Sequence, residues 1–222
     1  MMHVVCPLEF ERSVLARLGR NRGWTFACSG PGAAGIDRWA AGQDAPPPGA
    51  RVVLAGLAGA IAPLDASKAV VPGKVIDGAE GAWVPTLPGA AFQPLCCVGL
   101  DHVLGSVEAK DRAARAHHAD IVDMESAAFA RAAEARQWQW AVVRGISDTV
   151  DESLPKGIEG WVDDRGRLRI WHVVRALMAN PFLLRRLHRL RTRSLAGLAA
   201  ADAALRALDA GHTAAINAGT SR

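Results

Sequence analysis

The sequence predicts a three-layer α/β/α domain followed by a C-terminal helical extension. Short apolar segments alternate with helix-forming segments, and glycine-rich segments follow two of the predicted strands. The length of 222 residues suits one α/β domain that can bury a full core. We therefore divide the chain into an α/β domain at 1–180 and a basic amphipathic helix with a frayed tail at 181–222.

The predicted elements follow from hydrophobic periodicity and from glycine and proline positions. Short apolar runs predict strands at 3–6, 24–28, 51–55, 95–98 and 140–146, with irregular strands and turns at 69–84. Helical patterns occupy 9–18, 110–117, 127–136 and 171–178, before a break at Asn180-Pro181 and one long helix from Phe182 to Leu208. The glycine-rich segments 29–35 and 56–63 are predicted turns, and neither matches a nucleotide-binding fingerprint.

Composition excludes several classes of protein. Half of the residues are hydrophobic, which argues against disorder. No apolar run reaches the roughly 18 residues of a membrane span, and the N-terminus lacks the pattern of a signal peptide, so we expect a cytoplasmic protein. The four cysteines show no C-x-x-C spacing and no nearby histidines, which predicts free thiols and no metal site.

A basic block lies in the predicted C-terminal helix. From Arg185 to Arg193 the sequence contains five arginines, one histidine and no acidic residue, interleaved with leucines. An amphipathic helix of this kind can lie on a membrane surface, although a packed helix with a solvated face gives the same pattern. Nucleic-acid binding is a weaker alternative, because aromatic residues are not interleaved with the arginines. We expect no nucleic-acid partner.

The segment 120–151 carries the candidate site. An acidic turn containing Glu125 precedes the predicted helix at 127–136, and the apolar strand at 140–146 leads to Ser147 and Asp148. Ligands of open α/β sheets bind beyond the carboxyl ends of the strands. We therefore expect the carboxyl groups of Glu125 and Asp148 to meet in one pocket.

Two motifs in this segment, VDMESAA and VVRGISD, resemble those of the purine nucleoside phosphorylase and nucleosidase superfamily. Its members cleave the bond between a nucleobase and ribose. The segments CPLEFE and GLAGAIAP are similar to its first-strand turn and its glycine-rich turn, so the likeness covers roughly residues 3–160. The resemblance implies a nucleoside phosphorylase-like fold with a central mixed sheet, a small-molecule nucleoside substrate and a homodimer.

A more specific likeness is to the hopanoid-associated phosphorylase family, the adenosylhopane nucleosidases. It rests on RGISDTVDESLP, on GWVDDRGRLRI and on the segment from Ala176 to Leu208. This likeness implies cleavage of adenosylhopane in hopanoid biosynthesis, releasing adenine and leaving ribosylhopane by hydrolysis or phosphoribosylhopane by phosphorolysis. No cofactor is implied, and phosphate is the co-substrate if the reaction is phosphorolysis.

Cleavage of an N-glycosidic bond requires an acid for the departing base and a group that brings in the nucleophile. Asp148 is the candidate acid that protonates N7 of the purine, a role for which its carboxyl group must keep a proton at neutral pH, as burial favours. Ser147 precedes it in the Ser-Asp motif. Glu11, the last acid of LEFE, matches the water-activating glutamate of the superfamily and is the candidate general base, with Glu9 as a rival.

Further candidates bind the substrate. Glu125 suits the 2′- and 3′-hydroxyls of ribose, and Met124 an apolar wall beside the sugar. Arg144 interrupts an apolar strand, so it is expected to hold Glu11 and water, or a phosphate. The backbone at 56–59, which includes Ala58 and Gly59, could cradle an anion.

The nucleophile stays open at this stage. Leu57 and Ala58 carry no hydroxyl where many superfamily members have a serine, which slightly favours water over phosphate. Ser29 and Ser106 are potential substitutes for that serine.

Each candidate also has a purely structural interpretation. Asp148 could cap a helix, Glu125 could compensate a helix dipole, and Glu11 could be a solvated helix charge. Met124 could be a core residue, and Arg144 part of a structural ion pair. Two other functions therefore remain: a soluble methylthioadenosine/S-adenosylhomocysteine or purine nucleosidase, and a non-catalytic nucleoside-binding protein.

Overall fold

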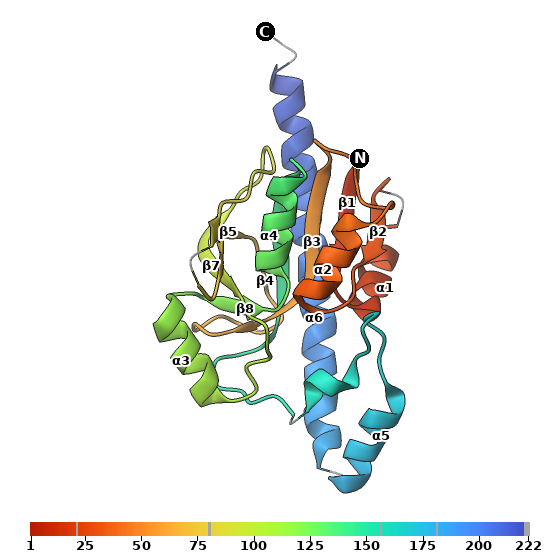
Figure 1. The fold of residues 1–222 in the computed structure, drawn as a ribbon, viewed down its shortest axis with the longest axis vertical. Helices are drawn as coiled ribbons and strands as arrows, with labels where there is room; N and C mark the ends of the chain where they lie inside the picture. The colour runs from red at the N-terminus through yellow and green to blue at the C-terminus, as the bar shows by residue number, and fades with distance from the viewer. Residues whose placement is uncertain (21, 80, 156, 181, 220–222) are drawn as a thin grey trace.

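The computed structural model of the chain describes residues 1–20, 22–79, 81–155, 157–180 and 182–219. One mixed β-sheet lies between two layers of helices, and a long C-terminal helix runs the length of the molecule (Figure 1). This architecture confirms the predicted fold class, including the mixed sheet and the helical extension.

The sheet contains nine strands within the described residues: β1 (Met2–Cys6), β2 (Thr25–Cys28), β3 (Arg51–Ala60), β4 (Ala69–Val70), β5 (Pro72–Asp77), β6 (Ala82–Trp83), β7 (Gln93–Gly99), β8 (Ile121–Asp123) and β9 (Gln139–Asp148). Their main order is β2-β1-β3-β8-β7-β5-β6, and β9 pairs with β3 and β4. Most neighbours are parallel, whereas β3–β8, β4–β9 and β5–β6 are antiparallel. The longest pairing joins β3 to β9, the two strands that carry the candidate site.

In the described part of the chain, four helices form two layers on the sheet, and three further elements lie outside these layers. Helices α2 (Gly32–Ala41) and α4 (Ser126–Ala135) pack on one face of the sheet, and α1 (Glu9–Leu18) and α6 (Leu183–Gly219) pack on the other. Helix α3 (Val107–His117) lies at one end of the sheet, while a 3-10 turn, η1 (Ile158–Trp161), and α5 (Ile170–Ala179) lie beyond its lower edge in Figure 1.

Alternation of side chains along β9 explains why its sequence is almost continuously apolar. Val142 and Ile146 pack with α2 and α4, whereas Ala141 and Val143 pack with α1 and α6. A strand that is covered on both faces needs apolar side chains at odd and even positions alike. The polar exceptions in this strand, Arg144 and Asp148, therefore require partners of their own.

Helix α6 approaches β9 closely because glycines face each other at the crossing. A Cβ atom on Gly145 would lie 2.4 Å from the carbonyl oxygen of Gly197, so neither backbone could come this near with a side chain between them. Further along, Asp209 accepts hydrogen bonds from Trp24 Nε1 at 2.9 Å and from Arg51 at 3.1 Å. These contacts hold α6 beyond Leu208, where the sequence predicts its end.

Helix α6 continues to Gly219, so most of the predicted frayed tail is helical. Residues 220–222 and Pro181, at the predicted helix break, lie outside the described residues. All four cysteines are free, as predicted. No helix in the described ranges combines the length and apolar character needed to cross a bilayer.

The glycine-rich segment 56–60 is strand rather than the predicted turn. It continues β3 and pairs with β9, with Gly56 opposite Arg144 and Gly59 opposite Asp148. A Cβ atom on Gly56 would lie 2.8 Å from both the Arg144 guanidinium and the Glu11 carboxylate. Glycine is therefore present here to leave room for neighbouring charged side chains. In the other glycine-rich segment, 29–35, helix α2 already begins at Gly32.

Candidate functional site

The β3–β9 ladder organises the candidate site into two clusters of charged side chains. One cluster surrounds Gly56 and the other surrounds Gly59, where a bulge in the pairing brings Asp148 opposite the glycine. The two glycines are three positions apart on β3, which corresponds to roughly 10 Å.

Arg144 is the centre of the first cluster. Its side chain is completely buried, and its Nε donates to Asp123 Oδ2 at 2.7 Å. Its Nη2 lies 3.4 Å from Glu125 Oε2 and 3.5 Å from the Ser126 hydroxyl. Its Nη1 has no hydrogen-bond partner among the described residues. A buried guanidinium N–H group without a partner is costly, so this atom marks a position where a water molecule or an anion would be stabilised.

Glu11 faces the same space. Its Oε1 accepts from the Leu57 amide at 2.8 Å and its Oε2 from the Leu8 amide at 3.0 Å. Burial raises the pKa of Glu11 to about 7, against the lowering effect of Arg144 and with a further increase from Glu125. A carboxyl group that titrates near neutral pH is suited to general-base chemistry.

The rival acid, Glu9, is in a different environment. Its side chain is 33% exposed and forms an ion pair with Arg12 at 2.7 Å on the same helix. Only Glu11 of this pair is buried beside Arg144.

Glu125 enters the first cluster because another residue caps its helix. The Asp123 carboxylate accepts the backbone amides of Glu125 at 3.1 Å and of Ser126 at 2.9 Å, which satisfies the start of α4. The Glu125 side chain makes no capping bond and instead accepts the Gly32 amide at 2.8 Å. Burial raises the pKa of Glu125, although Arg144 opposes the increase. Dipole compensation alone therefore does not explain this buried side chain.

Met124 lies on the partly open side of this cluster. Its side chain is half-buried, and its methyl group lies 4.0 Å from the Cβ position of Gly32. Gly32 is also the residue whose amide binds Glu125. The methionine thus places an apolar surface near the Glu125 carboxylate.

Asp148 is the centre of the second cluster. Its Oδ2 accepts from the ammonium group of Lys110, and both side chains are buried. The Ser147 hydroxyl lies 2.6 Å from the other carboxylate oxygen and 3.2 Å from the Ala58 carbonyl. Lys110 also donates to the carbonyl of Thr149 at 2.6 Å. Asp148 therefore has a cationic partner. The acid role predicted from the sequence instead assumes that burial keeps a proton on its carboxyl group.

Three residues of the two clusters were not predicted as site residues: Lys110, Asp123 and Ser126. One signal for Lys110 was available: it lies three positions before Ala113, and these two residues form the buried stripe of α3. Asp123 is the first acid of VDMES and ends a buried strand, which is typical of a helix-capping residue. The pairings of Lys110 with Asp148 and of Asp123 with Arg144 join segments that are distant along the chain, so they could not be predicted.

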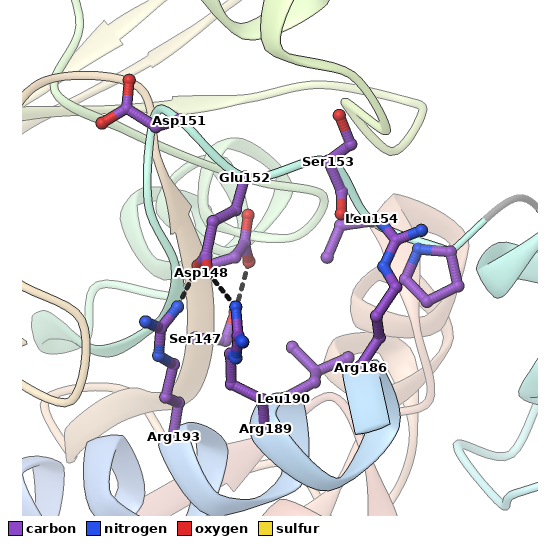
Figure 2. A pocket seen from close by; sticks show the side chains of 11 residues that line it. Ser147, Asp148, Asp151, Glu152, Ser153, Leu154, Arg186, Arg189, Leu190 and Arg193 are labelled. Atoms are coloured by element: carbon purple, nitrogen blue, oxygen red, sulfur yellow. Dashed lines mark hydrogen bonds and ion pairs between the residues drawn. The ribbon is translucent and has the colours of Figure 1, made fainter. Parts of the chain in front are cut away.

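A cavity of about 240 Å³ opens beside Asp148. It lies between the loop that follows β9 and the first turns of α6, as Figure 2 shows. Arg186, Arg189 and Arg193 of α6 line it, together with Glu152, which pairs with Arg193. The basic block of the sequence therefore contributes side chains to the wall opposite the candidate acid.

A second cavity, of about 550 Å³, lies near the first cluster. Ser29 and Gly30 line it, next to the turn that donates to Glu125, and so do Glu9, Arg38 and Arg167. Neither cavity is lined by both Glu125 and Asp148. Asp148 lines the first cavity and Glu125 lines neither, so the two predicted carboxylates, each in its own cluster, do not share the wall of either cavity.

The other predicted residues occupy the strands between the clusters. Ala58 is buried in β3, and its carbonyl approaches the Ser147 hydroxyl. A Cβ atom on Gly59 would lie 3.1 Å from Asp148 Oδ2. Ser106 caps α3 by accepting the Ala109 amide at 3.2 Å, so this hydroxyl serves a helix end. The Ser29 hydroxyl donates to the Gly30 carbonyl at 2.9 Å.

Comparison with solved structures identifies the architecture. Futalosine hydrolase of Helicobacter pylori matches with a TM-score of 0.64 at 13% identity, covering 93% of this chain and 96% of that one. The fold is nucleoside phosphorylase-like. The 5′-methylthioadenosine/S-adenosylhomocysteine nucleosidase of H. pylori, with butyl-thio-DADMe-Immucillin-A, matches this nucleoside phosphorylase-like chain with a TM-score of 0.65 at 13% identity and the same coverages, 93% and 96%.

A third structure extends this likeness. The nucleosidase of the same name from Campylobacter jejuni matches with a TM-score of 0.56 at 13% identity, covering 72% of this chain and 90% of that one. The family profile of the Phosphorylase superfamily matches residues 88–179, which include Lys110, Glu125, Arg144 and Asp148. No curated protein sequence matches the chain.

Proposed function

We propose that this protein cleaves the N-glycosidic bond of a purine nucleoside, and that its substrate is adenosylhopane. One observation carries the proposal: Glu11 and Arg144 lie against Gly56, Arg144 also reaches Glu125, and Asp148 lies opposite Gly59 on the same strand pair. Groups suited to the sugar and to the base are therefore a few residues apart. The profile match over 88–179 and the nucleosidases with the same fold support this assignment.

On the base side, Asp148 donates a proton to N7 as the C1′–N9 bond breaks and its electron pair passes to adenine. The ammonium group of Lys110 is the source of that proton, because it already donates to the Asp148 carboxylate. Ser147 orients the carboxylate through its other oxygen. Proton delivery to a leaving group is worth about 10²–10⁴-fold in rate when the acid is well placed.

On the sugar side, Glu125 accepts hydrogen bonds from the 2′- and 3′-hydroxyls of ribose. An ionised carboxylate has about four lone-pair positions, and the Gly32 amide and Arg144 occupy two of them. Two positions are left for the two hydroxyls. Met124 covers the sugar with its half-buried side chain.

The nucleophile in this proposal is water. Glu11 takes a proton from the water as its oxygen attacks C1′, and the unpartnered Nη1 of Arg144 holds that oxygen in place. The Leu57 amide already binds Glu11, which leaves it unable to bind a phosphate at the same time. The backbone of Ala58 and Gly59 lies between the two clusters on β3. Phosphorolysis, with phosphate at the Nη1 position, is the alternative within this reaction class.

Two other functions compete with this one. The solved structures that share the fold include enzymes named as methylthioadenosine/S-adenosylhomocysteine nucleosidases, which favours a soluble nucleoside as the alternative substrate. A nucleoside-binding protein without catalysis is the second alternative. Two features argue against it: the buried Lys110–Asp148 pair, and the buried Glu11 carboxyl group, whose pKa is raised to about 7.

We also propose that the protein acts in the cytoplasm as a homodimer, in peripheral contact with the inner membrane. The basic N-terminal half of α6, with Arg185, Arg189 and Arg191 exposed, suits anionic phospholipid headgroups. A lipid-linked substrate makes such contact useful.

The experiment that tests this function supplies adenosylhopane or methylthioadenosine to the full chain, with and without phosphate. Released adenine and the sugar product are identified by mass. We expect adenine and ribosylhopane from adenosylhopane, independent of phosphate. Release from methylthioadenosine alone would transfer the assignment to the soluble alternative, and no release from either substrate would leave a binding protein.

A further inference from the structure

Helix α5 is apolar in sequence yet has no buried side chain among those described. Its sequence is IWHVVRALMA. Apart from the histidine, the arginine and the final alanine, all seven residues are aliphatic, aromatic or methionine. In an ordinary globular domain such a helix would lie against the core. Here Trp171 is 82% exposed and Met178 is 81% exposed. Seven positions separate these two residues, so they lie on the same face of the helix.

The exposed apolar surface continues into the turn that leads to α6. Phe182 is 83% exposed and Leu184 is 61% exposed. At the N-terminal end of α5, Leu168 and Ile170 are exposed as well. We define the α5–α6 tip as residues 168–193 within the described ranges. In Figure 1 it projects beyond the lower edge of the sheet, away from the helices that cover the core.

The base of this tip is fixed, so its exposure is a property of the fold. Arg169 donates its amide to the Trp161 carbonyl at 2.7 Å, and Trp161 is buried. The Leu183 amide donates to the Asn180 carbonyl at 3.0 Å, and Arg186 donates to the Ser153 carbonyl at 2.6 Å. The two helices are thus held in place while their apolar side chains face outward.

Charge decides which partner fits. From Arg165 to Ala201 the sequence contains no acidic residue, and nine arginines lie within 165–193. Docking of a second copy through this surface would bring two sets of arginines together, which is unfavourable. A nucleic acid would satisfy the arginines, and its bases could stack on Trp171 and Phe182. It offers no apolar region, however, for the exposed aliphatic side chains beside them, Leu168, Met178 and Leu184. An anionic bilayer satisfies both features, since apolar side chains enter the acyl region while arginines bind headgroup phosphates.

We propose that the α5–α6 tip inserts into the surface of an anionic phospholipid bilayer. Trp171, Met178 and Phe182 enter the acyl boundary, and Arg175 and Arg185 bind the headgroups. The proposal extends the contact of the basic helix suggested above by assigning insertion to α5, and it stands without the nucleosidase activity.

The tip lies next to the candidate site. The Glu9 amide, two residues before Glu11, donates to the Gly166 carbonyl at 3.0 Å. A Cβ atom on Gly166 would lie 2.6 Å from the Pro7 carbonyl and 3.0 Å from Leu8 Cα, so the chain that leads into α5 packs directly on the start of α1. A protein held by this tip would have its Glu11 cluster close to the bilayer surface.

The test is flotation of the full-length protein with vesicles of phosphatidylcholine alone or mixed with phosphatidylglycerol, without substrate. We expect binding to the anionic vesicles, and a loss of about tenfold or more in partitioning for the double variant Trp171→Ser/Met178→Ser. Arg175→Gln/Arg185→Gln should weaken binding and reduce its salt dependence. Val84→Ser, which changes a side chain that is 68% exposed elsewhere, is the matched control and should bind like the parent protein.

Several results would overturn the proposal. These are failure to bind anionic vesicles, binding that the Trp171→Ser/Met178→Ser variant retains, and stronger binding to duplex DNA than to vesicles. A dimer that this variant converts to a monomer, without vesicle binding by the parent, would identify the tip as a self-association surface. Adenine release from adenosylhopane by the same preparations separates a failure here from a failure of the proposed function.

Discussion

The carboxylate of Asp148 and the ammonium group of Lys110 form a buried ion pair, although 38 residues separate them along the chain. Asp148 ends β9, and Lys110 lies on the buried stripe of α3. Removing one partner of a buried pair leaves an uncompensated charge, whereas removing both does not. The pair can therefore be tested by comparing the stability of the single variants with that of the double variant.

Lys110→Met should lower the free energy of unfolding by about 3–5 kcal/mol, because it leaves the Asp148 carboxylate buried and unpaired. Adding Asp148→Asn to this variant should restore part of the loss. Urea denaturation of the four proteins of this cycle measures both effects. The exposed Lys74 offers a matched control, and Lys74→Met should change stability by less than about 0.5 kcal/mol. Equal effects at the two lysines would contradict the buried pair.

Asp148→Asn should abolish adenine release, and because it leaves the Lys110 ammonium group without its carboxylate, it should also lower the free energy of unfolding. At a temperature where the variant is folded, substrate binding should be nearly intact. The amide keeps the size of the side chain and its contact with Ser147 but cannot pass a proton to the purine. Single-turnover release of adenine measures the chemical step, and equilibrium binding of a non-cleavable adenosine analogue measures the pocket. An Asp148→Asn protein that retains the parent rate would remove Asp148 from the acid role.

The raised pKa of Glu11 predicts the pH dependence of both activity and stability. As a base it must be ionised, so kcat/KM should rise with pH through an inflection near 7, and Glu11→Gln should remove this inflection with most of the activity. For stability the sign is opposite. The folded protein keeps the proton up to about pH 7, while the unfolded chain loses it near 4.5, so this group makes the protein less stable as pH rises across that interval.

Comparison of Glu11→Gln with the parent isolates this contribution. The variant should lose less unfolding free energy than the parent between pH 4.5 and 7. Chemical denaturation at several pH values across this window measures the difference. Parallel curves for the two proteins would show that Glu11 titrates at its ordinary value.

Gly56→Ala should be destabilising by about 1–3 kcal/mol and should reduce activity strongly. The new methyl group would lie 2.8 Å from both Arg144 Nη1 and Glu11 Oε1, in the space that the proposed water occupies. Gly105→Ala is the matched control, because its Cβ atom would meet nothing within 4 Å. Thermal unfolding and adenine release, measured on both variants, test the steric argument. Full activity in Gly56→Ala would exclude this space as the nucleophile site.

Glu125 should make the enzyme selective for ribonucleosides. Loss of a hydrogen bond to a charged group reduces kcat/KM by about tenfold to a hundredfold, so a 2′-deoxy substrate should react more slowly by this factor. In Glu125→Gln the preference should shrink, since the neutral amide binds hydroxyls more weakly. The ratio of kcat/KM values for the two substrates measures the effect, and an unchanged ratio would place the ribose hydroxyls elsewhere.

The sequence determined the fold class and the identity of most charged site residues. Apolar strands covered on both faces, helix-forming segments between them and the two acidic motifs are local patterns, and local patterns survive in the structure. Helix α1, for example, occupies the predicted residues 9–18. The burial of Arg144 was also predicted, because an arginine within an apolar strand has few other places to lie.

Only the tertiary structure decided how these residues are paired. The segment 56–60 became a strand because β9 offers it a parallel partner, and its glycines give room to side chains from α1 and β9. Lys110 pairs with Asp148, and Glu125 accepts hydrogen bonds from the Gly32 amide and from Arg144, through contacts between distant segments. The local sequence pattern does not predict such contacts, because their energy arises only when packing removes both partners from water.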